Sequence, residues 1–89
     1  MKDTPAFVYI LRSLKDGFYY VGCSVDPQRR LIEHNDGESK STRSHRPYEI
    51  ACLEEFPNLS AARKRESEIK RKKSRQYIEW LIAGERERT

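Results

Sequence analysis

Two short runs of β-branched and aromatic residues near the start of the chain predict a β-hairpin. Residues 6–11 read Ala-Phe-Val-Tyr-Ile-Leu, and residues 18–23 read Phe-Tyr-Tyr-Val-Gly-Cys. Such runs favour strands because branched and aromatic side chains pack well on a pleated surface. The dipeptide Asp16-Gly17 lies between them and is a strong signal for a tight turn. We therefore expect two antiparallel strands joined at this dipeptide.

The length of that turn decides which residues of the two strands lie opposite each other. A two-residue turn pairs Leu11 with Gly22. Because side chains alternate between the two faces of a sheet, Tyr9 and Tyr20 then share one face. A four-residue loop keeps the two tyrosines on one face, whereas a three-residue loop separates them.

A helix is predicted after the hairpin, from Pro27 to about His34. Asp26 is a favourable N-cap, proline suits the first helical position, and Gly37 follows the end of the helix. Arg30 and His34 are four positions apart and therefore lie on the same face of this helix. We expect that face to turn toward the rest of the protein.

The second half of the chain predicts one more strand and two more helices. The polar residues 38–47 are typical of a loop, and the alternation over residues 48–56 predicts a third strand. One helix is expected over residues 60–73, with its first residue, a serine, as the cap. A second helix is expected from a cap at Ser74 to a stop at Gly84.

These elements predict one domain of the α+β class, a small three-stranded antiparallel sheet (a hairpin plus a third strand) flanked by three helices. A chain of 89 residues has the length of a single small domain. Residues 1–5 and 85–89 are expected to be frayed ends. On the last helix, we expect Tyr77 and Trp80 to cover the sheet as core residues rather than to dock on a partner protein.

The composition argues against a membrane protein and against a secreted one. Charged residues make up 36% of the chain, and no apolar run approaches the roughly 18 residues that span a bilayer. The N-terminus has no signal-peptide pattern, so we expect a cytoplasmic protein. Cys23 and Cys52 form no C-x-x-C pair, and we expect both to be reduced and not to bind zinc.

The basic residues are concentrated in one stretch, although the net charge is only +4. Residues 63–75 contain eight basic side chains and two acidic ones. The stretch is either the solvated face of two helices or a surface that contacts phosphates without reading base sequence. The candidate phosphate contacts, on these helices and on the polar loop, are Lys40, Arg43, Arg46, Lys70, Arg71, Lys72 and Lys73.

One acidic residue interrupts the apolar stripe of the helix predicted over residues 60–73. The helical spacing of that stripe runs through Leu59, Ala62, Glu66 and Ile69. A carboxylate that faces a core is costly unless it pairs with a cation or binds a metal. Glu66 is therefore either an ion-pair partner of a neighbouring Arg or Lys, or a metal ligand.

Several short motifs occur in an order that is specific as a set, although each is weak alone. In chain order they are Phe7-Val8-Tyr9, Tyr20-Val21-Gly22, Asp26-x-x-Arg29-Arg30-Leu31-x-x-His34, His34-Asn35-x-Gly37, Lys40-x-Thr42-Arg43-x-x-Arg46-Pro47 and Glu66-x-x-Ile69-Lys70. The set resembles the GIY-YIG nuclease family, and in particular its small stand-alone bacterial members, over most of the chain. Three departures are that Phe7 replaces the first signature glycine, that Cys23 stands where Ser, Thr or Lys is commoner, and that the late asparagine of several family nucleases has no match.

The resemblance implies a GIY-YIG-like fold and a metal-dependent endonuclease that hydrolyses phosphodiester bonds. It implies that Glu66 binds one divalent ion, Mg²⁺ or Mn²⁺, and that Arg30 contacts the scissile phosphate. Tyr9 is the first choice to orient or deprotonate the attacking water, with Tyr20 or His34 assisting. The division of roles among these three side chains stays open.

The implied substrate is DNA, selected by its structure rather than its sequence, as in repair or recombination. Family members usually gain specificity from an attached domain or a protein partner, and this chain carries no second domain. The alternatives are a non-catalytic nucleic-acid-binding module, or a nuclease subunit that is inactive without its partner.

Overall fold

The computed structural model describes residues 4–84 and confirms the α+β class. In chain order the elements are β1 (Ala6–Ser13), β2 (Tyr19–Ser24), α1 (Pro27–Asn35), α2 (Lys40–Arg43), β3 (Tyr48–Phe56), α3 (Leu59–Lys72) and α4 (Arg75–Ala83). The frayed ends expected at residues 1–5 and 85–89 lie outside the described residues, except for Thr4 and Pro5.

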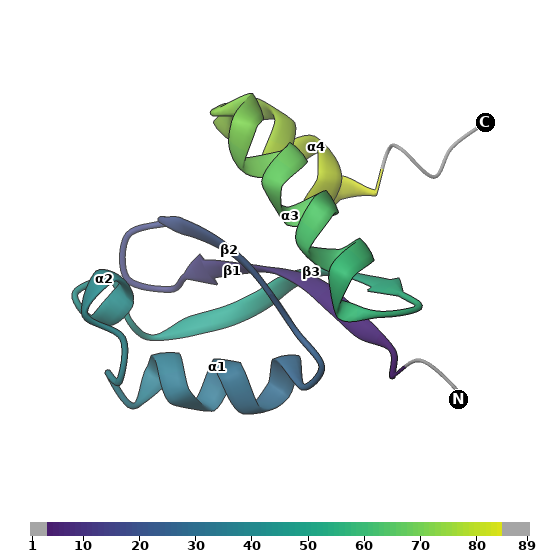
Figure 1. Ribbon diagram of the computed structural model, residues 1–89. Coiled ribbons are helices and arrows are strands. Elements are labelled where there is room, and N and C mark those ends of the chain that lie inside the picture. The colour runs from purple at the N-terminus through teal and green to yellow at the C-terminus, as the bar shows by residue number, and fades with distance from the viewer. Residues whose placement is uncertain (1–3, 85–89) are drawn as a thin grey trace.

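The three strands form one antiparallel sheet in the order β2-β1-β3, which makes β1 the central strand. Helix α1 and the short α2 lie on one side of this sheet, and α3 and α4 lie on the other (Figure 1). Because side chains of β1 alternate between the two sides, each face of the sheet has its own core. The core under α3 and α4 contains Ala6, Val8, Ile10, Val21, Ala62, Ile69 and Leu81. The core over α1 contains Tyr9, Leu11 and Tyr48, with Tyr20, Leu31 and Ile50 packed against it.

The hairpin loop is longer than the two residues that Asp16-Gly17 predicted. Leu11 pairs with Tyr20, and the backbone N–H of Ser13 donates to the carbonyl of Phe18 at 2.8 Å, so residues 14–17 form a four-residue loop. The side chain of Ser13 is the physical reason, because its Oγ accepts the backbone N–H groups of Lys15 and Asp16 and so holds the longer loop. The register is therefore shifted by two residues, which leaves Tyr9 and Tyr20 on one face as predicted.

The helix ends are set by side-chain caps, two of them as predicted. Asp26 accepts the N–H of Arg29 at 3.1 Å to cap α1, and Ser74 accepts the N–H of Tyr77 at 3.1 Å to cap α4. The predicted cap of α3 was wrong. Asn58, not the serine two residues later, accepts an N–H of the first turn at 2.9 Å, because its side chain precedes the first helical residue.

Residues 38–47 are not a simple loop, since they contain the four-residue helix α2. Thr42 in this helix is fully buried, and its carbonyl accepts the hydroxyl of Tyr48 at 2.9 Å. Tyr48, the first residue of β3, thus holds helix α2 in place, although the sequence of α2 is polar. Four helices are therefore present in the described part of the chain, where three were expected.

Trp80 is not a core residue, contrary to the sequence-based expectation. Its side chain is 38% exposed and stacks on Tyr77, with ring centroids 5.7 Å apart. Leu81 is the fully buried residue of α4, and Tyr77 is partly buried against the same core. Helix α4 therefore covers the sheet through Leu81 and its neighbours, while its indole lies at the surface.

Two expectations from composition can be compared with the structure. Both cysteines are free and half-buried, as expected. Between residues 4 and 84, no helix combines the length and apolarity that a membrane crossing requires.

Candidate active site

Three of the predicted site residues meet on the face of the sheet that packs on α1. Tyr9 from β1 and His34 from α1 are each 1% exposed, and the Tyr9 hydroxyl lies 3.5 Å from His34 Nε2. Tyr20 from β2 lies against both, with its ring centroid 6.3 Å from that of Tyr9 and 4.8 Å from that of His34. Strand periodicity and the α1 helix therefore bring together three groups that lie up to 25 positions apart.

Gly22 provides the space for the Tyr9 hydroxyl. It lies directly across from Tyr9 in the β1–β2 pair. A Cβ atom at this position would sit 2.6 Å from the Tyr9 hydroxyl oxygen and 3.1 Å from the Tyr20 ring. A side chain here would push both tyrosines aside, so the glycine of Tyr20-Val21-Gly22 is required by close packing against Tyr9.

Thr42 orients His34, a contact that the sequence analysis missed. His34 Nδ1 lies 2.8 Å from Thr42 Oγ1, and that hydroxyl in turn donates to the carbonyl of Ser39 at 3.4 Å. These bonds assign the proton to Nδ1, which leaves Nε2 as an acceptor toward Tyr9. Thr42 belongs to the motif Lys40-x-Thr42-Arg43, so its presence in that motif was the available signal.

Burial sets the charge states of the two central groups. It raises the pKa of Tyr9, against the opposing influence of the nearby Arg30 guanidinium. It also lowers the pKa of His34 from its ordinary value of 6.5, and the positive charge of Arg30 acts in the same direction. At neutral pH the pair is therefore an uncharged phenol beside an uncharged imidazole.

Arg30 lies one helical turn before His34 at the border between this cluster and solvent. Its side chain is 39% exposed and forms an ion pair with Glu33. The positive charge of the same guanidinium lowers the pKa of both Tyr9 and His34. Arg30 therefore lies at the rim of the cluster, on the same side of α1 as His34, as the helix spacing predicted.

Glu66 approaches from α3, on the other side of the edge strand β2. Its carboxylate accepts Lys70 Nζ at 2.6 Å, so the ion pair expected as one alternative is present. Lys70 also lies over the Tyr20 ring, 5.9 Å from the centroid, and thereby connects Glu66 to the tyrosine cluster. Burial alone would raise the pKa of Glu66, but hydrogen bonds from Cys23 and Lys70 outweigh it and lower the pKa. The carboxylate is thus anionic at neutral pH.

The donor set around Glu66 fits a hydrated divalent ion rather than a closed metal site. No group of three or more His, Cys, Asp or Glu side chains that could hold a metal occurs within residues 4–84. Glu66 offers one anionic carboxylate whose side chain is 20% exposed, and Cys23 beside it, with its pKa raised by burial to about 11, is a protonated thiol. Mg²⁺ accepts such a site, because it keeps several waters and takes one or two carboxylates together with substrate oxygens.

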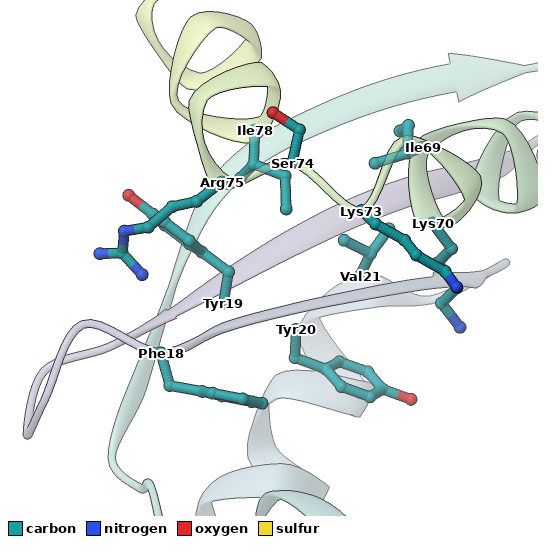
Figure 2. A pocket seen from close by; sticks show the side chains of 10 residues that line it. All are labelled: Phe18, Tyr19, Tyr20, Val21, Ile69, Lys70, Lys73, Ser74, Arg75 and Ile78. Atoms are coloured by element: carbon teal, nitrogen blue, oxygen red, sulfur yellow. The ribbon is translucent and has the colours of Figure 1, made fainter.

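The predicted phosphate contacts are divided among three places. Lys70 and Lys73 lie beside Tyr20 at one pocket on the β2 edge (Figure 2). Arg71 and Lys72 line a different pocket, where Lys72 Nζ lies 5.2 Å from the Tyr77 ring centroid. The loop cations are Lys40, at the exposed start of α2, and Arg43 and Arg46, which both approach Gly37.

Comparisons with known proteins identify a family and several relatives of this chain. The family model described as the GIY-YIG catalytic domain matches residues 5–79. A UPF0213 protein of Streptococcus pneumoniae is 38% identical over 80 residues, covering 89% of this chain and 80% of that protein. One from the archaeon Natronomonas pharaonis is 42% identical over 80 residues, covering 89% of this chain and 92% of the other.

A solved structure supports the fold as well. The solution NMR structure of a UPF0213 protein from Bacillus halodurans superimposes with a TM-score of 0.55 at 35% identity. The match covers 89% of this chain and 83% of that one. The family match spans every strand and all five of the residues expected to carry the chemistry. The chain therefore belongs to the GIY-YIG family of nucleases.

Proposed function

We propose that this protein is a divalent-metal-dependent endonuclease that hydrolyses phosphodiester bonds in DNA. One observation supports this most directly: the buried Tyr9 and His34, together with the half-buried Tyr20, form a polar cluster whose rim carries a guanidinium, from Arg30, and an anionic carboxylate, from Glu66. A core that served stability alone would gain more from apolar side chains at these positions.

Arg30 and Glu66 would bind the two charged components of the reaction. The planar Arg30 guanidinium can donate two parallel hydrogen bonds to the scissile phosphate and offset the charge that develops there. Glu66 would hold the divalent ion, which when bound polarises a phosphate oxygen and neutralises negative charge. The Glu66–Lys70 ion pair keeps the carboxylate anionic and in place before either component arrives.

Tyr9 and His34 would orient the attacking water and accept its proton. Because its pKa is raised, Tyr9 is not ionised at neutral pH and cannot act as a base by itself. Its hydroxyl, however, faces the acceptor nitrogen of His34. As the water attacks, Tyr9 can accept the water proton while its own proton passes to His34 Nε2. Tyr20, packed against both rings, would fix their geometry.

This proton route predicts a dependence of cleavage on pH. His34 must be uncharged, and burial lowers its pKa below the ordinary 6.5, so cleavage should fall on acidification along a limb centred below pH 6.5. The free energy of unfolding should also fall as the pH is lowered. In the unfolded chain His34 takes up a proton near pH 6.5, whereas in the folded protein its pKa is lower, so protonation favours the unfolded chain. Rates measured between pH 4.5 and 8 test this expectation.

The second histidine of the chain provides the matched control. His45 is partly exposed, stacks on Phe18 and pairs with Asp16. A His45→Gln variant should keep the same acidic limb. A limb centred above 6.5, or one lost in His45→Gln, would contradict the assignment to His34.

The substrate is expected to be DNA that is selected by shape. The seven cations named above as candidate phosphate contacts would bind the DNA backbone, and such contacts position a nucleic acid without identifying its bases. Branched, nicked or single-stranded DNA of the kind formed in repair or recombination is therefore the proposed substrate class. We accordingly expect a cytoplasmic protein.

The decisive experiment incubates the purified protein with end-labelled duplex, single-stranded and branched DNA, with Mg²⁺ or Mn²⁺ and with chelator. We expect cleavage that requires the metal, falls to background in chelator and returns when metal is restored. Salt-sensitive binding without cleavage of any DNA form would instead support the non-catalytic binding module. Cleavage that appears only after addition of a cell extract would support a subunit that needs a partner.

A further inference from the structure

A pocket of about 410 Å³ opens beside the candidate active site, between the edge of β2 and the turn that joins α3 to α4. It shares two residues, Tyr20 and Lys70, with the catalytic cluster. Figure 2 shows Val21, Ile69 and Ile78 forming its apolar floor. The pocket is therefore continuous with the place where the scissile phosphate would lie, yet none of the proposed catalytic roles uses it.

The β2 backbone adds hydrogen-bonding groups along one wall of this pocket. Strand β2 is at the edge of the sheet, paired only with β1. The N–H of Ser13 donates to Phe18, so Tyr20 and Gly22 also point their backbone groups toward β1. Tyr19 and Val21 alternate with them and direct their N–H and C=O groups outward. A ligand in the pocket thus meets an apolar floor and a row of donors and acceptors.

Positively charged side chains lie at both ends of the pocket. Lys70 and Lys73 lie at one end, next to Tyr20, and Arg75 lies at the other, stacked on the Tyr19 ring at 4.6 Å (Figure 2). A floor of apolar groups between cations, with aromatic rings beside them, has the character of sites that bind unpaired nucleotides. The charge excludes a purely apolar occupant such as a lipid tail or a hydrophobic helix.

The backbone at Lys73 is a second, independent observation. Lys73 ends α3 in the left-handed conformation, with φ of 48°, and is the only residue other than glycine with positive φ in residues 4–84. Glycine is the usual residue at such a helix end, because a Cβ atom is disfavoured there. The equivalent position of α4 is indeed a glycine, Gly84. Lys73 thus occupies a backbone position that disfavours any residue but glycine, and its side chain lines the pocket.

We propose that this pocket holds an unstacked nucleobase of the DNA strand that is cut, next to the scissile phosphate, while Lys73 and Arg75 contact phosphates of the same strand. The inference rests on the proposed nuclease function and narrows its substrate to DNA with unpaired nucleotides at the cleavage site. A base in a continuous duplex is paired and stacked and does not reach such a pocket.

The first test measures binding in chelator, so that it does not depend on cleavage. Wild-type protein is titrated into a labelled ten-nucleotide oligothymidylate, and into an oligonucleotide of equal length and charge that lacks its bases. We expect the oligothymidylate to bind at least about fivefold more tightly, since stacking of a base on aromatic side chains contributes that much or more. Equal affinities would overturn the proposal, because phosphate contacts alone would then explain binding.

The second test compares one lysine that lines the pocket, Lys73, with one on α3 that lies away from it, Lys64. Lys73→Gly removes one charge at the pocket, and should weaken oligothymidylate binding about fivefold at 0.1 M salt while the Tm stays equal or rises. The fivefold figure follows from a salt slope of about 0.7 per phosphate contact on single strands. Lys64→Ala removes one exposed charge beside Phe56, away from the pocket, and should change binding less than twofold. Equal losses in the two variants would contradict the pocket assignment.

Amide chemical shifts locate the ligand directly in a protein of this size. Addition of the oligothymidylate should shift signals of Tyr19, Val21 and Ser74 most strongly. Shifts centred on Arg71 and Tyr77 would overturn the proposal. Because binding is measured in chelator and cleavage in metal, loss of cleavage and loss of base binding are separable. A protein that never cleaves but binds bases here would refute the proposed function and not this site.

Discussion

Glu66→Ala should lower metal-dependent DNA cleavage by at least about 100-fold, the scale on which one electrostatic stabiliser of a transition state acts. Glu66 is the anionic, partly exposed carboxylate that reaches the site from α3. Without it, the divalent ion has no protein ligand at the site and the charge on the phosphate is not offset. Single-turnover cleavage of a labelled substrate at saturating Mg²⁺ measures the effect.

The fold should survive this substitution. The Glu66–Lys70 pair lies at the surface end of α3, with Lys70 51% exposed, and such pairs contribute about 0–1 kcal/mol. Glu68→Ala is the matched control, because it removes an exposed carboxylate two residues later on the same helix, where Glu68 pairs with Arg65. Wild-type cleavage by a folded Glu66→Ala protein would show that the metal binds elsewhere.

Arg30→Ala should lower the rate of metal-dependent DNA cleavage by a similar factor, again at least about 100-fold. The Arg30 guanidinium would both bind the scissile phosphate and offset its developing charge, so we expect kcat to fall more than substrate affinity. Arg30→Lys should recover only part of the rate, because an ammonium cannot reproduce the planar, two-pronged donation of a guanidinium. Rates and affinities measured separately, under single-turnover conditions, distinguish the two contributions.

Arg29→Ala is the control for charge removal at this end of α1. Arg29 is the neighbouring residue, its side chain is 75% exposed, and it pairs with the same partner, Glu33. We expect less than a twofold change in this variant. If Arg29→Ala and Arg30→Ala impaired cleavage equally, a general electrostatic effect would replace the assignment of Arg30 to the phosphate.

Local rules of the polypeptide backbone account for what was predicted correctly from the sequence. Asp26 and Ser74 cap helices because their side chains can satisfy free N–H groups wherever a helix follows them. Tyr9 and Tyr20 share a face because side chains in strands alternate with period two, which tolerates a loop longer by two residues. Arg30 and His34 share a helix face because they are four positions apart.

The errors arose where a side chain interacts with residues distant in sequence or with a competing neighbour. Asp16-Gly17 signals a two-residue turn, but Ser13 binds the loop backbone and lengthens it. Helix α2 was missed because its stability comes from contacts of Thr42 with Tyr48. Trp80 was assigned to the core because the small sheet needs a helix to cover it, although α4 turns Leu81 inward instead.

The basic stretch illustrates the limit of helical periodicity. Spacing alone shows that Lys70 and Lys73 lie on a different side of α3 from Lys72. It does not show which side turns toward Tyr20, because that depends on how α3 packs across the edge strand β2. The tertiary structure therefore selects which lysines adjoin the candidate site.

The sequence by itself determined the order of the three strands and of helices α1, α3 and α4, the caps of α1 and α4, the common face of the two tyrosines and the family, because all of these follow from local spacing and motif. Only the tertiary structure decided the hairpin register, the orientation of His34 by Thr42, the approach of Glu66 across β2 and the pocket at Lys73. Each of these depends on the packing of side chains from different elements, and the distances between such side chains are not encoded in the spacing of either element.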